Sequence, residues 1–116
     1  MEIDNRHKLE LYDNGVPVGE TWYNLEPKDN FFGKQYLSIY DLFVNEEYRR
    51  KGYATKLLDR VIDIAENLRI DTISLIVDKN NKEAVRLYFK HGFEIYQDHK
   101  ERYCLVFNKV WNNQGV

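Results

Sequence analysis

Cysteine is almost absent from this sequence of 116 residues, and long apolar runs are missing altogether. The single cysteine, Cys104, excludes a disulfide within the chain. It lies in the apolar run RYCLVFNKV, which is typical of a strand, so we expect a buried thiol. No run reaches the ~18 apolar residues that a membrane span needs, and residues 1–11 lack the apolar stretch of a signal peptide. We therefore expect a cytoplasmic protein without a membrane partner.

The chain also lacks an excess of either charge. It has 17 basic and 19 acidic residues and a net charge of −2, which argues against nucleic acid as a partner. Its three histidines, His7, His91 and His99, show no metal-ligand spacing with one another or with Cys104, so we predict no metal. A length of 116 residues with 43% hydrophobic residues predicts a single domain over residues 1–116.

Local patterns predict an α+β domain. Alternating or β-branched runs predict six strands, at residues 7–12, 16–25, 36–44, 71–78, 93–97 and 101–110. Apolar residues at spacings of three and four predict a helix over about residues 52–68. The capping-box spacing of Asn80 and Glu83 predicts a second helix that ends near His91, before Gly92. The expected order is β-β-β-α-β-α-β-β, with a mixed, mostly antiparallel sheet flanked by the helices.

Three cations precede the first predicted helix. Arg49, Arg50 and Lys51 stand where the helix dipole is already positive, so each should cost about 0.3–1 kcal/mol unless something offsets it. An anion at the helix N-terminus would reverse this cost, because the first backbone N–H groups have no partner within the helix. Gly52 and Ala54 keep the approach to the backbone open. The pattern therefore indicates a phosphate or pyrophosphate site.

A solvated basic turn is the alternative interpretation of the same residues. In that case Glu46 and Glu47 would neutralise part of the positive charge. The segment is neither a Walker loop nor a G-x-G-x-x-G motif, so those motifs do not decide between the two interpretations.

Two segments, residues 44–58 and 74–94, closely resemble the GNAT superfamily of acetyl-CoA-dependent N-acetyltransferases. The first matches the family's pyrophosphate signature, R/Q-x-x-G-x-G/A, at Arg49, Gly52 and Ala54. The second matches the family pattern N-x-x-A-x-x-L-Y-x-x-x-G-F at Asn81, Ala84, Leu87, Tyr88, Gly92 and Phe93. Both occur in order and with fitting spacing, and the resemblance covers roughly residues 36–110. It implies a GNAT-like fold.

The chain departs from the family pattern at three places. Glu46 stands where the family often has proline, and Arg50 where glycine is common, but neither change removes a backbone donor. Family members usually carry two helices between the first two strands, and these helices wall the acceptor site. Here residues 13–15, DNG, leave room only for a tight turn. We therefore expect a truncated acceptor side.

The resemblance implies direct acetyl transfer from acetyl-CoA, as acyl-donor cosubstrate, to a primary amine of a small molecule or a protein. The pantetheine arm would pair like an extra strand with the backbone of the strand at residues 42–44, where an N–H group would also stabilise the oxyanion. The pyrophosphate would bind the backbone at residues 50–55. The implied cosubstrate-binding residues are Leu42, Phe43, Val44, Arg49, Arg50, Lys51, Gly52, Tyr53, Ala54, Thr55, Asn81, Ala84 and Tyr88. For Asn81 the alternative is a helix cap, and one residue could fill both roles.

Two catalytic candidates follow. Tyr88 matches the family's general acid, and an ordinary phenol pKa near 10 suits proton donation to a thiolate; the alternative is a residue that merely packs on an amphipathic helix. The attacking amine must be neutral, so a base or a water chain is needed. Asp41 is the first choice for this base, ahead of Glu20 and Tyr40, and its alternative is a solvated carboxylate.

Other functions remain open from the sequence. The chain could be a regulatory or interaction module that binds acetyl-CoA with little turnover, because the acceptor walls are missing. A homodimer could complete the short N-terminal region, and the aromatic residues expected to be exposed motivate it: Trp22, Tyr23, Phe31, Phe32 and Trp111. The acceptor-facing half carries four acidic residues, which suggest a cationic amine: Glu20, Glu26, Asp29 and Asp41.

Overall fold

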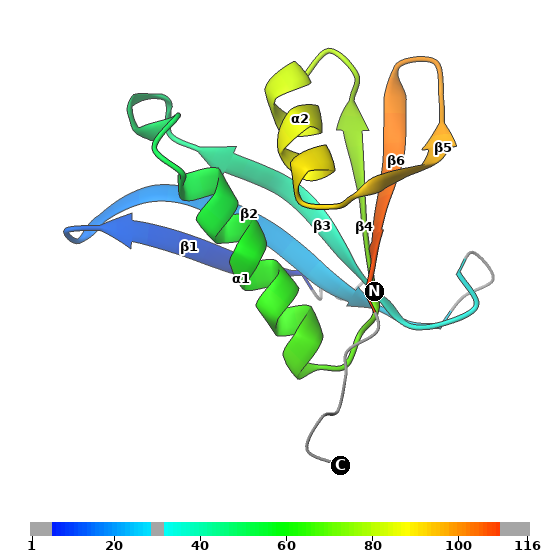
Figure 1. Cartoon of the computed structure of the whole chain (residues 1–116). Helices are drawn as coiled ribbons and strands as arrows, with labels where there is room; N and C mark the ends of the chain where they lie inside the picture. The colour runs from blue at the N-terminus through cyan, green and yellow to red at the C-terminus, as the bar shows by residue number, and fades with distance from the viewer. Residues whose placement is uncertain (1–5, 29–31, 110–116) are drawn as a thin grey trace, which may run out of the picture.

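A six-stranded sheet with two α-helices forms the protein (Figure 1). The computed structural model describes residues 6–28 and 32–109. The strands are β1 (His7–Asp13), β2 (Val16–Glu26), β3 (Tyr36–Val44), β4 (Thr72–Asp78), β5 (Glu94–Asp98) and β6 (Arg102–Asn108); the helices are α1 (Tyr53–Asn67), α2 (Lys82–Lys90) and the short 3₁₀ helix η1 (Glu46–Tyr48). The α+β class and the predicted order are confirmed; only η1 was not expected, because three residues show no periodicity.

The sheet has the order β1-β2-β3-β4-β6-β5, and β3 and β4 are its parallel pair. Their ladder joins only residues 37–39 to residues 73–75, although β3 continues to Val44 and β4 to Asp78. Beyond the ladder the two strands diverge, as Figure 1 shows. Within the described part of the chain, the edge of β3 at residues 40–44 that faces β4 therefore pairs with no strand.

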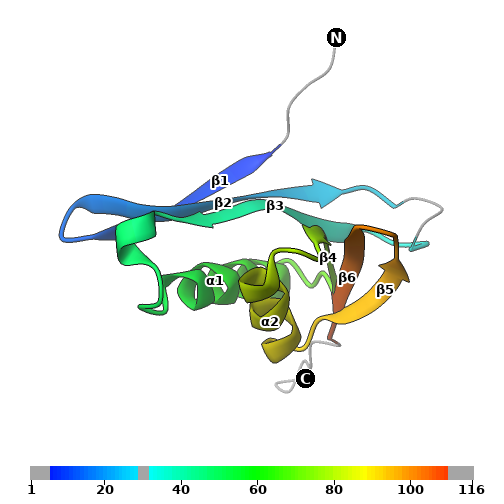
Figure 2. The same ribbon diagram turned by 90° about the horizontal axis from the view of Figure 1, so that it is seen from above.

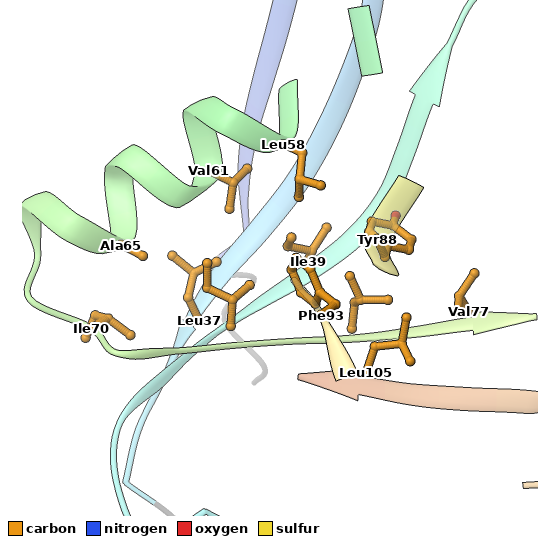
Figure 3. Packing of buried hydrophobic residues seen from close by; sticks show 12 residues of the cluster. Leu37, Ile39, Leu58, Val61, Ala65, Ile70, Val77, Tyr88, Phe93 and Leu105 are labelled. Carbon is orange, nitrogen blue, oxygen red and sulfur yellow. The ribbon is translucent and has the colours of Figure 1, made fainter. Parts of the chain in front are cut away.

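The hydrophobic core lies between the helices and one face of the sheet. Helix α1 covers one face of the β1–β3 half, whereas α2 lies where β3 and β4 diverge and packs against β4 (Figure 1 and Figure 2). Helix α1 buries Leu58, Val61 and Ala65, which its spacing of three and four residues places on one side. These side chains pack against Leu37 and Ile39 of β3 (Figure 3). The core therefore holds α1 close to β3.

The N-cap of α2 is Asn81, for which a helix cap was the alternative role, and not Asn80 of the predicted capping box. The N–H of Asn81 donates to the carbonyl oxygen of Asp78 (3.0 Å), which closes the preceding turn at Asn81 instead of Asn80. The Oδ1 atom of Asn81 then accepts from the N–H of Ala84 (3.3 Å). The predicted capping box with Glu83 is therefore wrong, because two adjacent asparagines carry the same local signal.

The first two strands form a hairpin without an intervening helix. Asn14 and Gly15 form its turn with positive φ angles of 51° and 80°, as the DNG signal predicted. Cys104 lies in β6 and is buried, as predicted. Along residues 6–28 and 32–109, no helix is long and apolar enough to cross a membrane.

The aromatic residues that motivated a homodimer are less exposed than expected. Trp22, Tyr23 and Phe32 are each half-buried. The other two, Phe31 and Trp111, lie outside the described residues. Contacts with other parts of the sheet cover the described three, so their exposure no longer argues for a partner copy. A homodimer stays a prediction.

Candidate functional site

A cavity of about 470 Å³ opens where β3 diverges from β4 and where α1 and α2 begin. Its lining residues are Leu42, Phe43, Val44, Tyr48, Arg49, Arg50, Gly52, Tyr53, Ala54, Thr55, Asn81, Glu83, Ala84, Arg86, Leu87 and Tyr88. All the predicted cosubstrate-binding residues are among them except Lys51. The segments meet here because the core holds α1 against β3 while α2 crosses near β4.

Four lining residues were not predicted: Tyr48, Glu83, Arg86 and Leu87. Leu87 follows Ala84 by three residues and precedes Tyr88, so helical spacing alone could have found it. Tyr48 lies in η1, which brings its ring beside Tyr53 with 6.2 Å between the ring centroids. No local signal in the sequence indicates that contact.

Helix α1 begins at the cavity without a side-chain cap. Gly52 is the N-cap, with a left-handed φ of 85°, and the first intrahelical bond runs from the N–H of Lys56 to the Gly52 carbonyl (3.1 Å). The N–H groups of Tyr53, Ala54 and Thr55 therefore have no partner within the helix, and all three residues line the cavity. No acidic residue lies in this first turn. The cavity thus meets a positive helix end with open donors.

The three cations before α1 have different partners. Arg49 donates from Nε to the carbonyl oxygen of Val44 (2.9 Å), and this bond ties the loop to the end of β3. Arg50 forms an exposed ion pair with Glu83 (3.6 Å), so it reaches from the start of α1 to the first turn of α2. Lys51 is not among the residues that line the cavity; its Nζ atom lies 5.6 Å from the ring centroid of Tyr48, and its contact with the cosubstrate stays a prediction.

A β-bulge interrupts β3 beside the cavity. The register of β2 and β3 shifts between Glu20 and Trp22, and Asp41 has a φ of 47°. The bulge leaves Asp41 exposed and outside the lining residues, whereas the next residue, Leu42, lines the cavity. The structure therefore does not bring the predicted base together with Tyr88.

Gly19 allows β2 to approach the strand that lines the cavity. A Cβ atom at Gly19 would lie 2.8 Å from the backbone oxygen of Phe43 and 3.2 Å from Cδ1 of Leu57. A side chain here would push β3 and α1 away. Because Gly19 has no side chain, β2 can approach closely enough to hold Phe43 and Val44 at the cavity wall.

Tyr88 brings a buried phenol to the cavity. Its side chain is only 6% exposed, and its ring packs against Phe93 with 5.5 Å between the centroids. Burial raises the pKa of the Tyr88 hydroxyl to about 12, because the phenolate loses its hydration. Figure 3 shows the Tyr88 ring within the core cluster, near Phe93, and the residue also lines the cavity. At neutral pH it is a neutral hydrogen-bond donor, and burial makes it a weaker acid than the ordinary phenol on which the expected match to a thiolate rested.

Comparison with known proteins identifies the family that this arrangement fits. The profile described as the acetyltransferase (GNAT) family matches residues 2–93. A spermine/spermidine N(1)-acetyltransferase of Bacillus subtilis (strain 168) is 36% identical over 88 residues, which are 72% of this chain and 57% of that protein. N-alpha-acetyltransferase 50 of Danio rerio is 34% identical over 104 residues, 89% of this chain and 60% of that protein. The chain thus spans less than two thirds of these curated relatives.

Solved structures share the fold. The PaiA N-acetyltransferase of Thermoplasma acidophilum in complex with coenzyme A has a TM-score of 0.79 at 16% identity, over 90% of this chain and 62% of that one. The N-acetyltransferase PseH of Campylobacter jejuni in complex with acetyl coenzyme A has a TM-score of 0.74 at 19% identity, over 93% of this chain and 71% of that one. At these identities the likeness shows the fold alone.

Proposed function

Because the chain belongs to the GNAT family of acetyltransferases, we propose that it transfers an acetyl group from acetyl-CoA to a primary amine. The observation that carries the proposal is the cavity itself. It joins an uncapped helix N-terminus, an unpaired strand edge and a buried phenol. The structures of PaiA with coenzyme A and of PseH with acetyl coenzyme A support the choice of donor.

The pyrophosphate of acetyl-CoA binds at the start of α1 in this proposal. The N–H groups of residues 53–55, which have no partner within the helix, can bind an anion, and Arg49 and Arg50 line the same cavity. A Cβ atom built on Gly52 meets nothing within 4 Å, so there is room for a phosphate beside the backbone. The ligand thereby removes the dipole cost that the three cations impose.

The pantetheine arm lies along the edge of β3 at residues 40–44. This edge has backbone donors and acceptors with no strand partner in the described chain, as an added strand requires. One N–H of residues 42–44 faces the thioester carbonyl and stabilises its developing negative charge. Asn81 caps α2 with its Oδ1 atom and lines the cavity, and this leaves its Nδ2 group to contact the arm.

The chemistry is one acyl transfer with two proton movements. The amine nitrogen attacks the thioester carbonyl, the new C–N bond forms, and the C–S bond breaks as the thiolate leaves. Tyr88 donates its proton to that thiolate, and its raised pKa keeps the proton in place until then. Asp41 stays our candidate for the base; because it is exposed at the bulge, it would receive the amine proton through water.

An acetyl-CoA-binding module with little turnover is the second candidate. It is favoured by the direct turn between β1 and β2, which leaves this part of the described chain without a helix to wall the acceptor site. The relatives named above act on polyamines or on protein N-termini by their names, so both acceptor classes are candidates for this chain.

Release of free CoA discriminates the two candidates. The protein is incubated with acetyl-CoA and a panel of monoamines, diamines, polyamines and peptides with free N-termini. Transfer predicts amine-dependent CoA release, and a module predicts release no faster than in buffer for every amine.

Tyr88→Phe is the matched variant for this assay, because it keeps the ring and removes only the donor. We expect kcat to fall by roughly 10²-fold, or about 2.7 kcal/mol of transition-state stabilisation, while the Kd for CoA changes little. A variant with the wild-type kcat, when chemistry limits turnover, removes Tyr88 from the mechanism.

A further inference from the structure

Aromatic and acidic side chains gather on the sheet face that the helices do not cover. We define Trp22, Tyr40, Glu20 and Glu26 as the aromatic–acidic patch. Trp22 lies directly opposite Tyr40 in the β2–β3 ladder, so both point to one face. Their neighbours along the strands belong to the opposite, helix-facing side, where Ile39 is in the core. Glu20 and Glu26 share the face of Trp22 because strand side chains alternate.

The patch already holds two cations of this chain. The guanidinium carbon of Arg6 lies 5.9 Å from the ring centroid of Trp22 and 5.9 Å from that of Tyr40. The Nζ atom of Lys8 lies 5.6 Å from the Trp22 centroid and 3.7 Å from Oε1 of Glu20. These are distances at which aromatic faces attract cations. The surface therefore has the geometry of a cation site, and the chain's own side chains show how a cation sits on it.

Hydrogen bonds hold the groups of the patch in place. The Oε1 atom of Glu26 accepts from Asn24 Nδ2 (2.8 Å), Ser38 Oγ (2.9 Å) and the Tyr40 hydroxyl (2.9 Å). Trp22 donates from Nε1 to Oε2 of Glu20 (3.0 Å). Rings and carboxylates that are fixed in this way lose little freedom when they bind a cation.

One acceptor atom on this face has no donor. The Oδ1 atom of Asn24 is buried without a hydrogen-bond partner among the described residues. Asn24 lies opposite Ser38 in the ladder and so shares the face of the patch. A buried carbonyl oxygen without a donor costs free energy. Its burial keeps it out of reach of a ligand on the surface, so it marks the face of the patch but is not a contact of the bound cation.

We propose that the aromatic–acidic patch binds the second cationic group of a diamine or polyamine acceptor, and that Arg6 occupies this position until the acceptor displaces it. The inference rests on the proposed acetyl transfer. Arg6 precedes β1, so its movement breaks no strand pairing.

The position of the patch suits an acceptor of this length. Tyr40 is two residues from Leu42, which lines the cavity, and it is the first residue of β3 beyond the ladder with β4. The bulge at Asp41 separates the two residues, so their backbones are at most about 7 Å apart, and the extended chain of 1,4-diaminobutane can span that distance. One nitrogen can therefore lie over the rings while the other lies where the strands diverge.

Calorimetric binding to the CoA-loaded protein tests the site without turnover. We expect 1,4-diaminobutane to bind at least tenfold more tightly than n-butylamine, which has the same chain and one cation. Tyr40→Leu removes the ring and should weaken diamine binding by about three- to fivefold. Tyr40→Phe keeps the ring and should stay within twofold of the wild type.

Arg6 provides the second matched pair. Arg6→Ala removes the competing cation and should tighten diamine binding by about two- to fivefold, whereas Arg6→Lys keeps a cation and should not. Equal affinities for diamine and monoamine, or equal effects of Tyr40→Leu and Tyr40→Phe, overturn the site. The site is also overturned if peptides with free N-termini bind in a way that depends on Tyr40 and the diamine does not bind, because the patch then serves a protein acceptor.

The assay for CoA release separates this inference from the proposed function. Transfer to butylamine with no preference for the diamine leaves the proposed function in place and overturns the patch. If no amine releases CoA, but the diamine binds and Tyr40→Leu weakens this binding while Tyr40→Phe does not, the cation site is supported and the proposed transfer is wrong.

Discussion

Gly52 offers a pair of substitutions that differ only in charge. Its φ of 85° is left-handed, and asparagine and aspartate tolerate this region better than other residues with a side chain. A Cβ atom at Gly52 meets nothing within 4 Å, so both side chains have room. Gly52→Asn and Gly52→Asp should therefore share the same backbone strain, about 1 kcal/mol. Any difference between them reports the added negative charge.

The free protein should be more stable with aspartate than with asparagine. The new carboxylate lies at the N-terminus of α1, beside Arg49, Arg50 and Lys51, so it should add about 0.3–1 kcal/mol to the free energy of unfolding. A chain of 116 residues has an unfolding entropy of about 0.24 kcal/mol/K. The Tm of Gly52→Asp should thus exceed that of Gly52→Asn by about 1–4 °C.

The affinity for CoA should show the opposite order, with Gly52→Asp binding CoA more weakly than Gly52→Asn. A carboxylate about 5 Å from the pyrophosphate should cost roughly 1–3 kcal/mol, which weakens binding by about 5- to 150-fold. CoA at 100 times the Kd stabilises the folded state by about 2.7 kcal/mol, a rise in Tm of about 11 °C. For Gly52→Asp the same concentration should give only about 0.3–1.8 kcal/mol, or about 1–7 °C.

Differential scanning calorimetry with and without CoA measures both effects. We expect Gly52→Asn to keep most of the CoA-induced rise in Tm and Gly52→Asp to lose most of it. Ionic strength near 1 M should shrink the difference, because salt screens exposed charges. An equal CoA-induced rise in both variants would refute the placement of the pyrophosphate at the start of α1.

Three further predictions follow from the same structure. Gly19→Ala should lower the free energy of unfolding by about 1–3 kcal/mol and weaken CoA binding, since the new Cβ displaces Phe43 and Val44; unchanged thermal unfolding contradicts this. The pKa of Tyr88 is about 12, so between pH 10 and 12 its hydroxyl ionises in the unfolded state but not in the folded state. Over this range the free energy of unfolding of the wild type should fall by up to about 2.7 kcal/mol relative to that of Tyr88→Phe. Below pH 10 the difference between the two proteins should be constant. A chelator or a reductant should leave the unfolding midpoint unchanged, and a large drop with a reductant would contradict a free, buried Cys104.

The elements and much of the site could be predicted because their signals are local. Alternation places strands, apolar spacing places α1, and the motif at residues 49–54 places the helix start that the cavity uses. The choice between Asn80 and Asn81 as N-cap could not be made, since both carry the same side chain and only the Asp78 hydrogen bond decides.

The sequence by itself determined the order of strands and helices, the turn at Asn14 and Gly15, and the glycine from which α1 starts, because each depends on neighbours within a few residues. Only the tertiary structure decided which groups meet. The bulge that leaves Asp41 outside the cavity depends on the pairing of β3 with β2, and the pKa of Tyr88 depends on its burial in the core. Such contacts join residues far apart in the chain, so no local pattern contains them.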